Sequence, residues 1–229
     1  MVAEEHAAGD EFSSDPEDSS IPLLGIKHLL LFTTIAAAFF VLEKASNLWT
    51  ADVPSQTVAV AQRTSLLLYD VVTAAAVTGL VILLRNRDAK GRAFRASGHW
   101  IVLAHVSESI SFLPVRFWQE LNLYVVAIIV HAIVLVLIAR ANRGRWHWLF
   151  GIQSLVTLIG ISFLFFPSLY SLSQMSGIIL NLVMLGVLLQ ETLGGRHRDW
   201  IHVLGIGAIS YSFVAMGFWQ LASFSGWFR

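Results

Sequence analysis

The stretch GHWIVLAHVSESISFLP, from Gly98 to Pro114, decides how this chain folds. It is apolar at both ends, yet it carries Glu108 near its middle. At about 1.5 Å of rise per helical residue, the Glu108 Cα lies about 15 Å from Gly98, near the centre of a hydrocarbon core about 30 Å thick. A carboxylate at that depth costs at least about 2.5–3.5 kcal/mol unless it faces the protein interior. The stretch therefore predicts a membrane helix with its polar face inside a bundle.

Other polar residues of this stretch share the face that carries the acid. At about 100° of rotation per residue, His105, Glu108 and Ser109 lie on one side of the helix, and Ser107 extends the polar arc. We therefore expect this arc to meet polar groups on neighbouring helices.

Composition indicates that most of the chain lies in lipid. Of its 229 residues, 56% are hydrophobic and 13% are charged, which is too apolar for a soluble domain of this length. The absence of cysteine excludes disulfides, thiol nucleophiles and Cys-ligated metals. We predict an all-α polytopic protein of the cell (plasma or inner) membrane, whose partner is the lipid bilayer and which binds no nucleic acid.

Charge separates a short tail from the remainder. Residues 1–20 carry seven acidic residues and no Lys or Arg, and they hold few apolar side chains. Such a segment cannot bury enough surface to offset the cost of ordering. We predict a disordered, acidic, cytoplasmic tail over residues 1–20 and a seven-helix transmembrane domain over residues 21–229.

Seven apolar runs are long enough to cross a bilayer. They are Pro22–Leu42, Thr64–Leu84, Gly98–Pro114, Leu121–Ala139, Trp146–Phe166, Gln174–Gln190 and Trp200–Ala222. Pro114 and Pro167 are expected to end the third and fifth runs, because proline interrupts helical hydrogen bonding. In the seventh run, small residues that include Gly205 and Ala208 recur at helical spacing and indicate a close packing seam.

Basic residues give the orientation. Lys27 and the loops after the second, fourth and sixth runs hold 11 of the 15 Lys and Arg residues, which leaves Lys44, Arg63, Arg116 and Arg229 for the other side. By the positive-inside rule, the amino terminus is cytoplasmic and the carboxyl terminus is outside.

Two further ionisable residues extend the predicted polar interior. His131 lies at mid-depth in the fourth run, at a level similar to Glu108, and a short loop makes the third and fourth runs antiparallel neighbours. We therefore expect a Glu108–His131 hydrogen bond. Asp70 lies in the second run, nearer the outside, where Arg116, Lys44 or Glu43 could meet it. The predicted buried polar cluster comprises Asp70, His105, Ser107, Glu108 and His131.

This inventory is compatible with several functions. Asp70, Glu108, His105 and His131 could form a chain of titratable groups for transport, proton relay or sensing. Alternatively, the same residues could serve only to hold a structural membrane subunit together. A retinal protein with a Schiff base is excluded, because the seventh run contains no lysine.

Enzymatic alternatives use the same residues. A b-type cytochrome would use His105 and His131 as the haem ligands, since they are the only deep histidine pair. A hydrolase would use Ser107 and Asp70 with some of His105, His131 and His202. The sequence identifies no metal site or cofactor and leaves enzymatic activity undecided. Four other histidines, His28, His99, His147 and His202, begin the odd-numbered runs, where we expect them to be hydrated at the interface.

Overall fold

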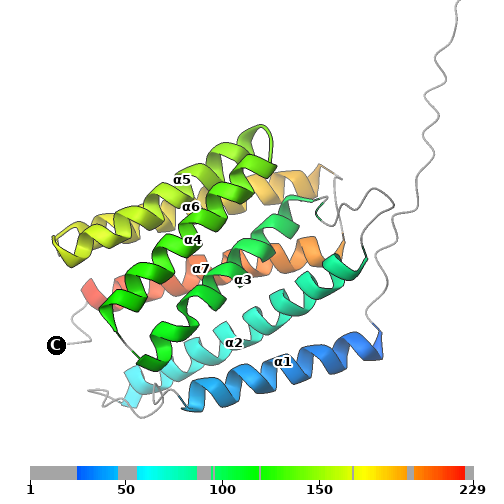
Figure 1. Ribbon diagram of the computed structural model, residues 1–229, viewed down its shortest axis with the longest axis horizontal. Coiled ribbons are helices and arrows are strands. Elements are labelled where there is room, and N and C mark those ends of the chain that lie inside the picture. Colours follow the sequence, from blue (N-terminus) through cyan, green and yellow to red (C-terminus); the bar gives the residue numbers. More distant parts are fainter. Residues whose placement is uncertain are drawn as a thin grey trace, which may run out of the picture.

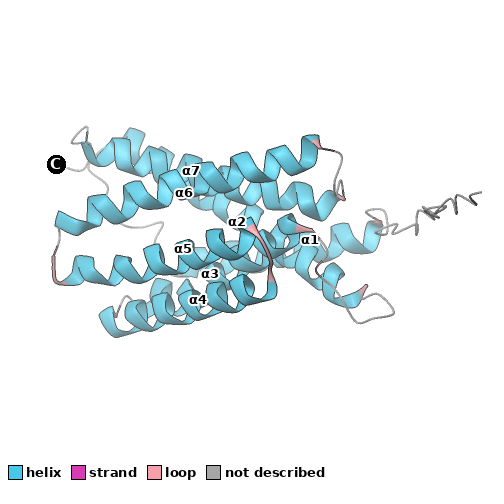
Figure 2. Ribbon diagram, turned by 90° about the horizontal axis from the view of Figure 1, so that it is seen from above, coloured by secondary structure: helices cyan, strands magenta, loops and turns pink. Residues whose placement is uncertain are grey.

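The computed structural model describes residues 25–45, 56–86, 94, 96–118, 120–166, 168–194 and 199–224. Within these residues every regular element is a helix (Figure 2). The elements are α1 (Ile26–Ala45), α2 (Gln56–Arg85), α3 (Ser97–Trp118), α4 (Leu121–Ala141), α5 (Arg145–Ile159), the 3₁₀ helix η1 (Gly160–Leu164), α6 (Ser168–Leu193) and α7 (Trp200–Phe224). The predicted all-α class is confirmed for this part of the chain. The predicted tail, residues 1–20, lies outside the described residues.

Successive helices run in opposite directions along a common axis (Figure 1). Consequently α1, α3, α5 and α7 begin at the same end of the bundle, where α2, α4 and α6 finish. Arg85 and Arg140 lie in the last turns of α2 and α4 at this end, and Arg145 begins α5 there. We call it the basic end, and we call the other the opposite end.

Helices α2 to α7 form a closed ring in which each packs on the next and α7 packs back on α2. An additional contact between α3 and α7 divides this ring into two compartments. The smaller lies among α2, α3 and α7, and the larger lies among α3 to α7. Helix α1 packs mainly on α2, outside the ring.

The contact between α3 and α7 depends on two glycines. A Cβ added to Gly205 would lie 2.5 Å from the carbonyl oxygen of Gly98, and one added to Gly98 would lie 2.7 Å from the Cα of His202. Side chains larger than hydrogen would therefore force the two backbones apart. The small-residue seam predicted on the seventh run is the place where α7 meets α3.

The distribution of polar and apolar side chains is the reverse of that in a soluble protein. The described interior holds Asp70, His105, His131, Asn181 and other polar side chains, whereas many large apolar side chains are exposed. Among the described residues, three helical segments are long and apolar enough to cross a membrane, namely Arg63–Arg85, Leu121–Ala141 and Leu172–Leu193. This pattern indicates an integral membrane protein, because polar groups need partners inside the bundle where the solvent is lipid.

Several predicted boundaries were wrong. Helix α3 continues through Pro114 to Trp118, because a bundle can tolerate the one backbone hydrogen bond that proline removes. Helix α2 begins at Gln56, eight residues before the predicted start, in a segment too polar to be recognised by hydropathy. The predicted run Trp146–Phe166 is divided at Gly160, where α5 gives way to η1.

Candidate functional site

A chain of side-chain hydrogen bonds connects α2 with α3 in the smaller compartment. The hydroxyl of Tyr69 lies 2.7 Å from the Ser109 Oγ, and Ser109 Oγ lies 3.2 Å from the Thr73 Oγ1. Thr73 Oγ1 lies 3.3 Å from the His105 Nε2. The chain forms because Tyr69 and Thr73 are four residues apart on α2, as are His105 and Ser109 on α3, so each pair presents one face to the other.

Each hydroxyl in this chain can both donate and accept a hydrogen bond. Ser109 has one proton and several acceptors for it, because its Oγ also lies 2.9 Å from the carbonyl oxygen of His105. Its proton can therefore point along the chain or back to its own helix. A row of such groups can reverse its hydrogen-bond direction without moving any heavy atom.

An ion pair borders the chain on the side of the opposite end. Arg116 Nη1 lies 3.9 Å from Asp70 Oδ1, and the guanidinium lies 4.5 Å from the centre of the Tyr69 ring. This agrees with the prediction that Arg116 is a candidate partner for Asp70. Asp70 is 3% exposed, and neither of its carboxylate oxygens has a hydrogen-bond partner among the described residues.

His105 also faces a cavity in the larger compartment. The cavity has a volume of ≈ 30 Å³ and is walled by five helices, α3 to α7. Its polar lining consists of His105, Glu108, His131, Gln153, Asn181 and Ser212. His105 is thus the residue at which the hydroxyl chain meets the cavity.

The predicted hydrogen bond between Glu108 and His131 is not formed. Both side chains line the cavity, but His131 Nδ1 lies 3.0 Å from the Ser107 Oγ instead. His131 does lie at the level of this part of α3, but Ser107 and Glu108 are adjacent and so have almost the same depth. Ser107 also lies 2.8 Å from the carbonyl oxygen of Ala104, so its hydroxyl proton has two competing acceptors.

The five predicted cluster residues therefore occupy two places. Glu108, His105 and His131 share the cavity, and Ser107 is bonded to His131. Asp70 instead pairs with Arg116 and does not line the cavity. Tyr69 and Gln153 were not predicted from the sequence. The available signals were the i, i+4 spacing of Tyr69 and Thr73, and the isolated amide of Gln153 within an apolar run.

The described residues do not assemble a haem or metal site. The His105 Nε2 and His131 Nδ1 atoms are hydrogen-bonded to Thr73 and Ser107 respectively, and the cavity that both histidines face is far smaller than a porphyrin. Among the described residues, no group of three or more His, Asp or Glu side chains is arranged to hold a metal ion.

The residues proposed for a hydrolase do not form a catalytic triad either. Ser107 and His131 lie within hydrogen-bond distance, as a nucleophile and its base would. However, Asp70 is paired with Arg116, and His202 is bonded to Thr192 at the basic end. Ser107 also lies within α3, where the helix uses the backbone N–H groups that an oxyanion hole would need.

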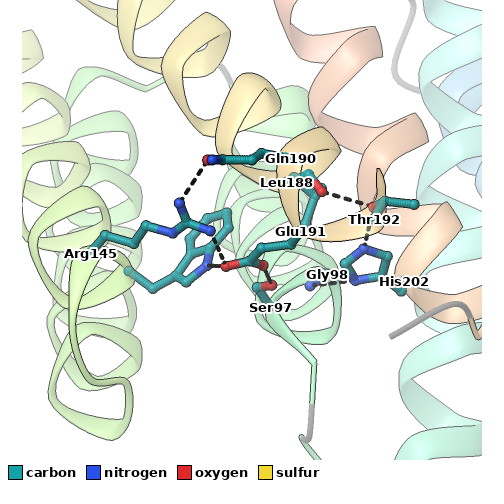
Figure 3. Close-up of polar contacts among 9 residues, drawn as sticks. Ser97, Gly98, Arg145, Leu188, Gln190, Glu191, Thr192 and His202 are labelled. Atoms are coloured by element: carbon teal, nitrogen blue, oxygen red, sulfur yellow. Dashed lines mark hydrogen bonds and ion pairs between the residues drawn. The ribbon is translucent and has the colours of Figure 1, made fainter. Parts of the chain in front are cut away.

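A second polar network lies at the basic end (Figure 3). The Glu191 carboxylate of α6 accepts hydrogen bonds from Ser97 of α3, from Trp146 Nε1 at 2.8 Å and from Arg145 at 2.9 Å, both of α5. Gln190 accepts a further bond from Arg145 at 2.9 Å. One carboxylate therefore joins the ends of three helices.

His202 joins α7 to the same end of the bundle (Figure 3). Its Nδ1 accepts the Gly98 N–H at 3.3 Å, so the proton of the neutral ring is on Nε2, which lies 2.9 Å from the Thr192 Oγ1. Thr192 in turn donates to the Leu188 carbonyl at 2.8 Å. Every step of this chain has a defined donor, in contrast to the hydroxyl chain at Ser109.

Asp199 caps α7 and binds α3. One oxygen accepts the His202 N–H at 2.7 Å, as an N-cap carboxylate does, and the other lies 2.8 Å from the His99 Nε2. Burial raises the pKa of Asp199, but the hydrogen bonds and charge interactions with His99 and His202 outweigh burial and hold the pKa below its ordinary value.

The histidines that begin the odd-numbered helices are not simply hydrated. His28, His99 and His202 are buried, and each accepts a backbone N–H, from Gly25, Ala96 and Gly98 respectively. His147 Nδ1 donates to the Ala139 carbonyl at 2.8 Å. All four lie at the third position of their helices, where a side chain can reach unsatisfied terminal groups.

An apolar layer separates the two polar regions. Leu135 of α4, Phe150 of α5 and Leu188 of α6 are fully buried in one hydrophobic cluster. Along their helices these residues lie between the cavity and the basic end, because His131 and Gln153 are on one side of them and Glu191 is on the other. The cavity is therefore connected by polar groups toward the opposite end and faces an apolar layer toward the basic end.

No family model matches this chain, and neither curated proteins nor solved structures give a significant match.

Proposed function

We propose that this chain is a seven-span membrane protein that conducts protons through a buried His/Glu centre. The seven-span arrangement is supported by the alternating helix directions and the inverted burial. Helix α5, with 15 residues, is the shortest, but together with the 5 residues of η1 it extends about 32 Å, which suffices for a core about 30 Å thick. The distribution of cations supports a cytoplasmic location for the basic end.

The observation that carries proton conduction is the hydrogen-bonded chain Tyr69–Ser109–Thr73–His105. A buried hydrogen-bonded chain that served only to stabilise the fold would need no more than one fixed set of bonds. This one ends on an imidazole, which can take up a proton at one nitrogen and release it from the other. Chains of titratable groups inside membrane helices are typical of proton pathways.

The His105 ring receives protons from the side of the opposite end. Asp70, Arg116 and Tyr69 form the outer part of this path, and the cavity with Glu108 and His131 forms its inner part. The layer of Leu135, Phe150 and Leu188 closes the route beyond the cavity. Transfer to the basic end therefore requires this layer to rearrange, which makes the protein a gated carrier of protons rather than an open pore.

Proton flux into vesicles tests this proposal. The purified protein is reconstituted into liposomes containing a pH-sensitive dye, with a potassium gradient and valinomycin to set the voltage. Thr73→Val keeps the shape of the side chain but removes the hydroxyl that contacts His105, so we expect flux to fall at least several-fold. Thr78→Val is the matched control, because Thr78 is also buried on α2 but, among the described residues, donates its hydroxyl to the Ala74 carbonyl of its own helix.

Two results contradict the proposal. One is a flux through the intact protein no greater than that of protein-free vesicles. The other is equal flux through Thr73→Val and Thr78→Val, which would show that the hydroxyl chain carries no protons.

A further inference from the structure

We infer that the cavity among α3 to α7 is a binding site for water that joins His105 to Glu108 and His131. Its volume of ≈ 30 Å³ is the space open to water-sized molecules. A single water requires about 10–15 Å³ on this measure, so the cavity has room for about two.

The lining has the chemistry that water requires. A buried water typically makes about three hydrogen bonds to polar groups, whereas cavities lined only by apolar groups stay dry. Here a carboxyl group, two imidazoles, two amides and a hydroxyl converge from five different helices. Such a mixture of donors and acceptors suits a molecule that can both donate and accept.

The side chain of Gln153 indicates a ligand that can donate a hydrogen bond. Its Oε1 is buried and has no hydrogen-bond donor among the described residues. A buried acceptor left in this state costs about 1–3 kcal/mol, and such groups are usually satisfied by water. Because Gln153 lines the cavity, a water there donates to Oε1 directly.

The bound water also links by hydrogen bonds three side chains that form no direct hydrogen bond with one another. His105 is bonded to Thr73, and His131 is bonded to Ser107, but no direct hydrogen bond joins either ring to Glu108. Water in the shared cavity bridges these three groups. This hydration site does not depend on proton conduction, because it would stabilise the same side chains in a protein that carries none.

Radiolytic hydroxyl labelling tests the site in the full-length protein in nanodiscs. Millisecond X-ray pulses generate radicals from bound water, and these oxidise adjacent side chains even when they are buried. Met184 lines the cavity, is 1% exposed and is readily oxidised. A radical scavenger in the bulk solution suppresses labelling from outside. We expect Met184 to be oxidised despite the scavenger.

A cavity-filling variant with a matched control gives the decisive comparison. Ala208→Leu places a larger side chain in the cavity wall, and we expect Met184 oxidation to fall several-fold. Gly207→Leu adds a side chain to the same helix, at a position where an added Cβ meets no atom within 4 Å, so oxidation should match the parent protein. Equal Met184 oxidation in the parent and Ala208→Leu proteins would overturn the proposal.

Gln153→Leu keeps the proposal testable if Ala208→Leu does not fold. Removing the acceptor should lower Met184 oxidation and should leave Tm unchanged or lower it, because a water hydrogen bond is lost. A higher Tm with unchanged oxidation would mean that Oε1 was simply unsatisfied, and it would overturn the water site. Vesicle proton flux is measured separately, so a dry cavity and a failed relay can be distinguished.

Discussion

The basic end and the cavity region are both polar, but they satisfy their polar groups differently. At the basic end, Glu191 accepts bonds from Ser97, Arg145 and Trp146, and both ring nitrogens of His202 are hydrogen-bonded. Around the cavity, the Ser107 and Ser109 protons have competing acceptors, and Gln153 Oε1 has no donor among the described residues. Trp200 Nε1, buried without an acceptor among those residues, is an exception at the basic end.

The two regions differ in how many hydrogen-bond arrangements they allow, and this difference suits them to different roles. A charge-assisted cluster with one hydrogen-bond arrangement holds helix ends in one position. A cluster of hydroxyls and imidazoles with several arrangements of similar energy can change its protonation without unfolding. Under the proposed function, the basic end stabilises the bundle and the cavity region transfers protons.

The largest expected effect is at the crossing of α3 and α7. Gly205→Ala places a Cβ within 2.5 Å of the Gly98 carbonyl oxygen, and neither backbone can move without separating the helices. We expect a loss of about 3 kcal/mol, at the upper end of the range for overpacking. Unfolding in mixed micelles measures it, with Gly207→Ala as the control that should be nearly neutral. Equal stability of the two variants would show that the basic end is not rigidly packed.

Removing the carboxylate of Glu191 should have the next largest effect. Glu191→Ala leaves the Trp146 N–H and the Ser97 hydroxyl without their acceptor, and we expect a loss of about 2 kcal/mol. Gln190→Ala removes only an exposed bond to Arg145 and should cost less than about 0.5 kcal/mol. Both variants should retain proton flux when folded. A specific loss of flux in Glu191→Ala would remove the distinction between the two regions.

The smallest expected effect concerns the choice of partner for His131. A double-mutant cycle of Ser107→Ala with His131→Ala should give a coupling of about 0.6 kcal/mol, which is typical of hydrogen bonds between membrane helices. The cycle of Glu108→Gln with His131→Ala should give less, because no direct bond joins these side chains. A larger coupling for the Glu108 cycle would restore the partner predicted from depth alone.

Hydropathy and charge predicted the helical class, and depth along the helices brought His105, Glu108 and His131 to one level. The helix boundaries were less predictable, because hydropathy alone does not determine where a helix begins or ends. The polar first turns of α2 resemble a loop by hydropathy, and Pro114 resembles a terminator although the helix continues beyond it. Partner choice could not be predicted, because Ser107 and Glu108 are adjacent and differ by only about 100° around the helix.

The histidines at the helix starts show a second limit of prediction from the sequence. Sequence position placed His28, His99 and His202 at helix ends, where hydration was the simplest expectation. The structure buries them against backbone N–H groups. A side chain's average environment at a helix terminus does not reveal whether a neighbouring helix covers it, since that depends on packing among elements distant in sequence.

The apolar layer of Leu135, Phe150 and Leu188 also has an electrical consequence. If polar groups extend from His105 toward only one face of the membrane, a proton that reaches this ring has crossed part of the transmembrane field. A full crossing corresponds to about 2.3 kcal/mol per 100 mV, so a proton stopped near mid-depth gains or loses about half of that. The occupancy of the buried centre then depends on membrane voltage as well as on proton concentration. The same three side chains that block the path make the centre responsive to the potential across it.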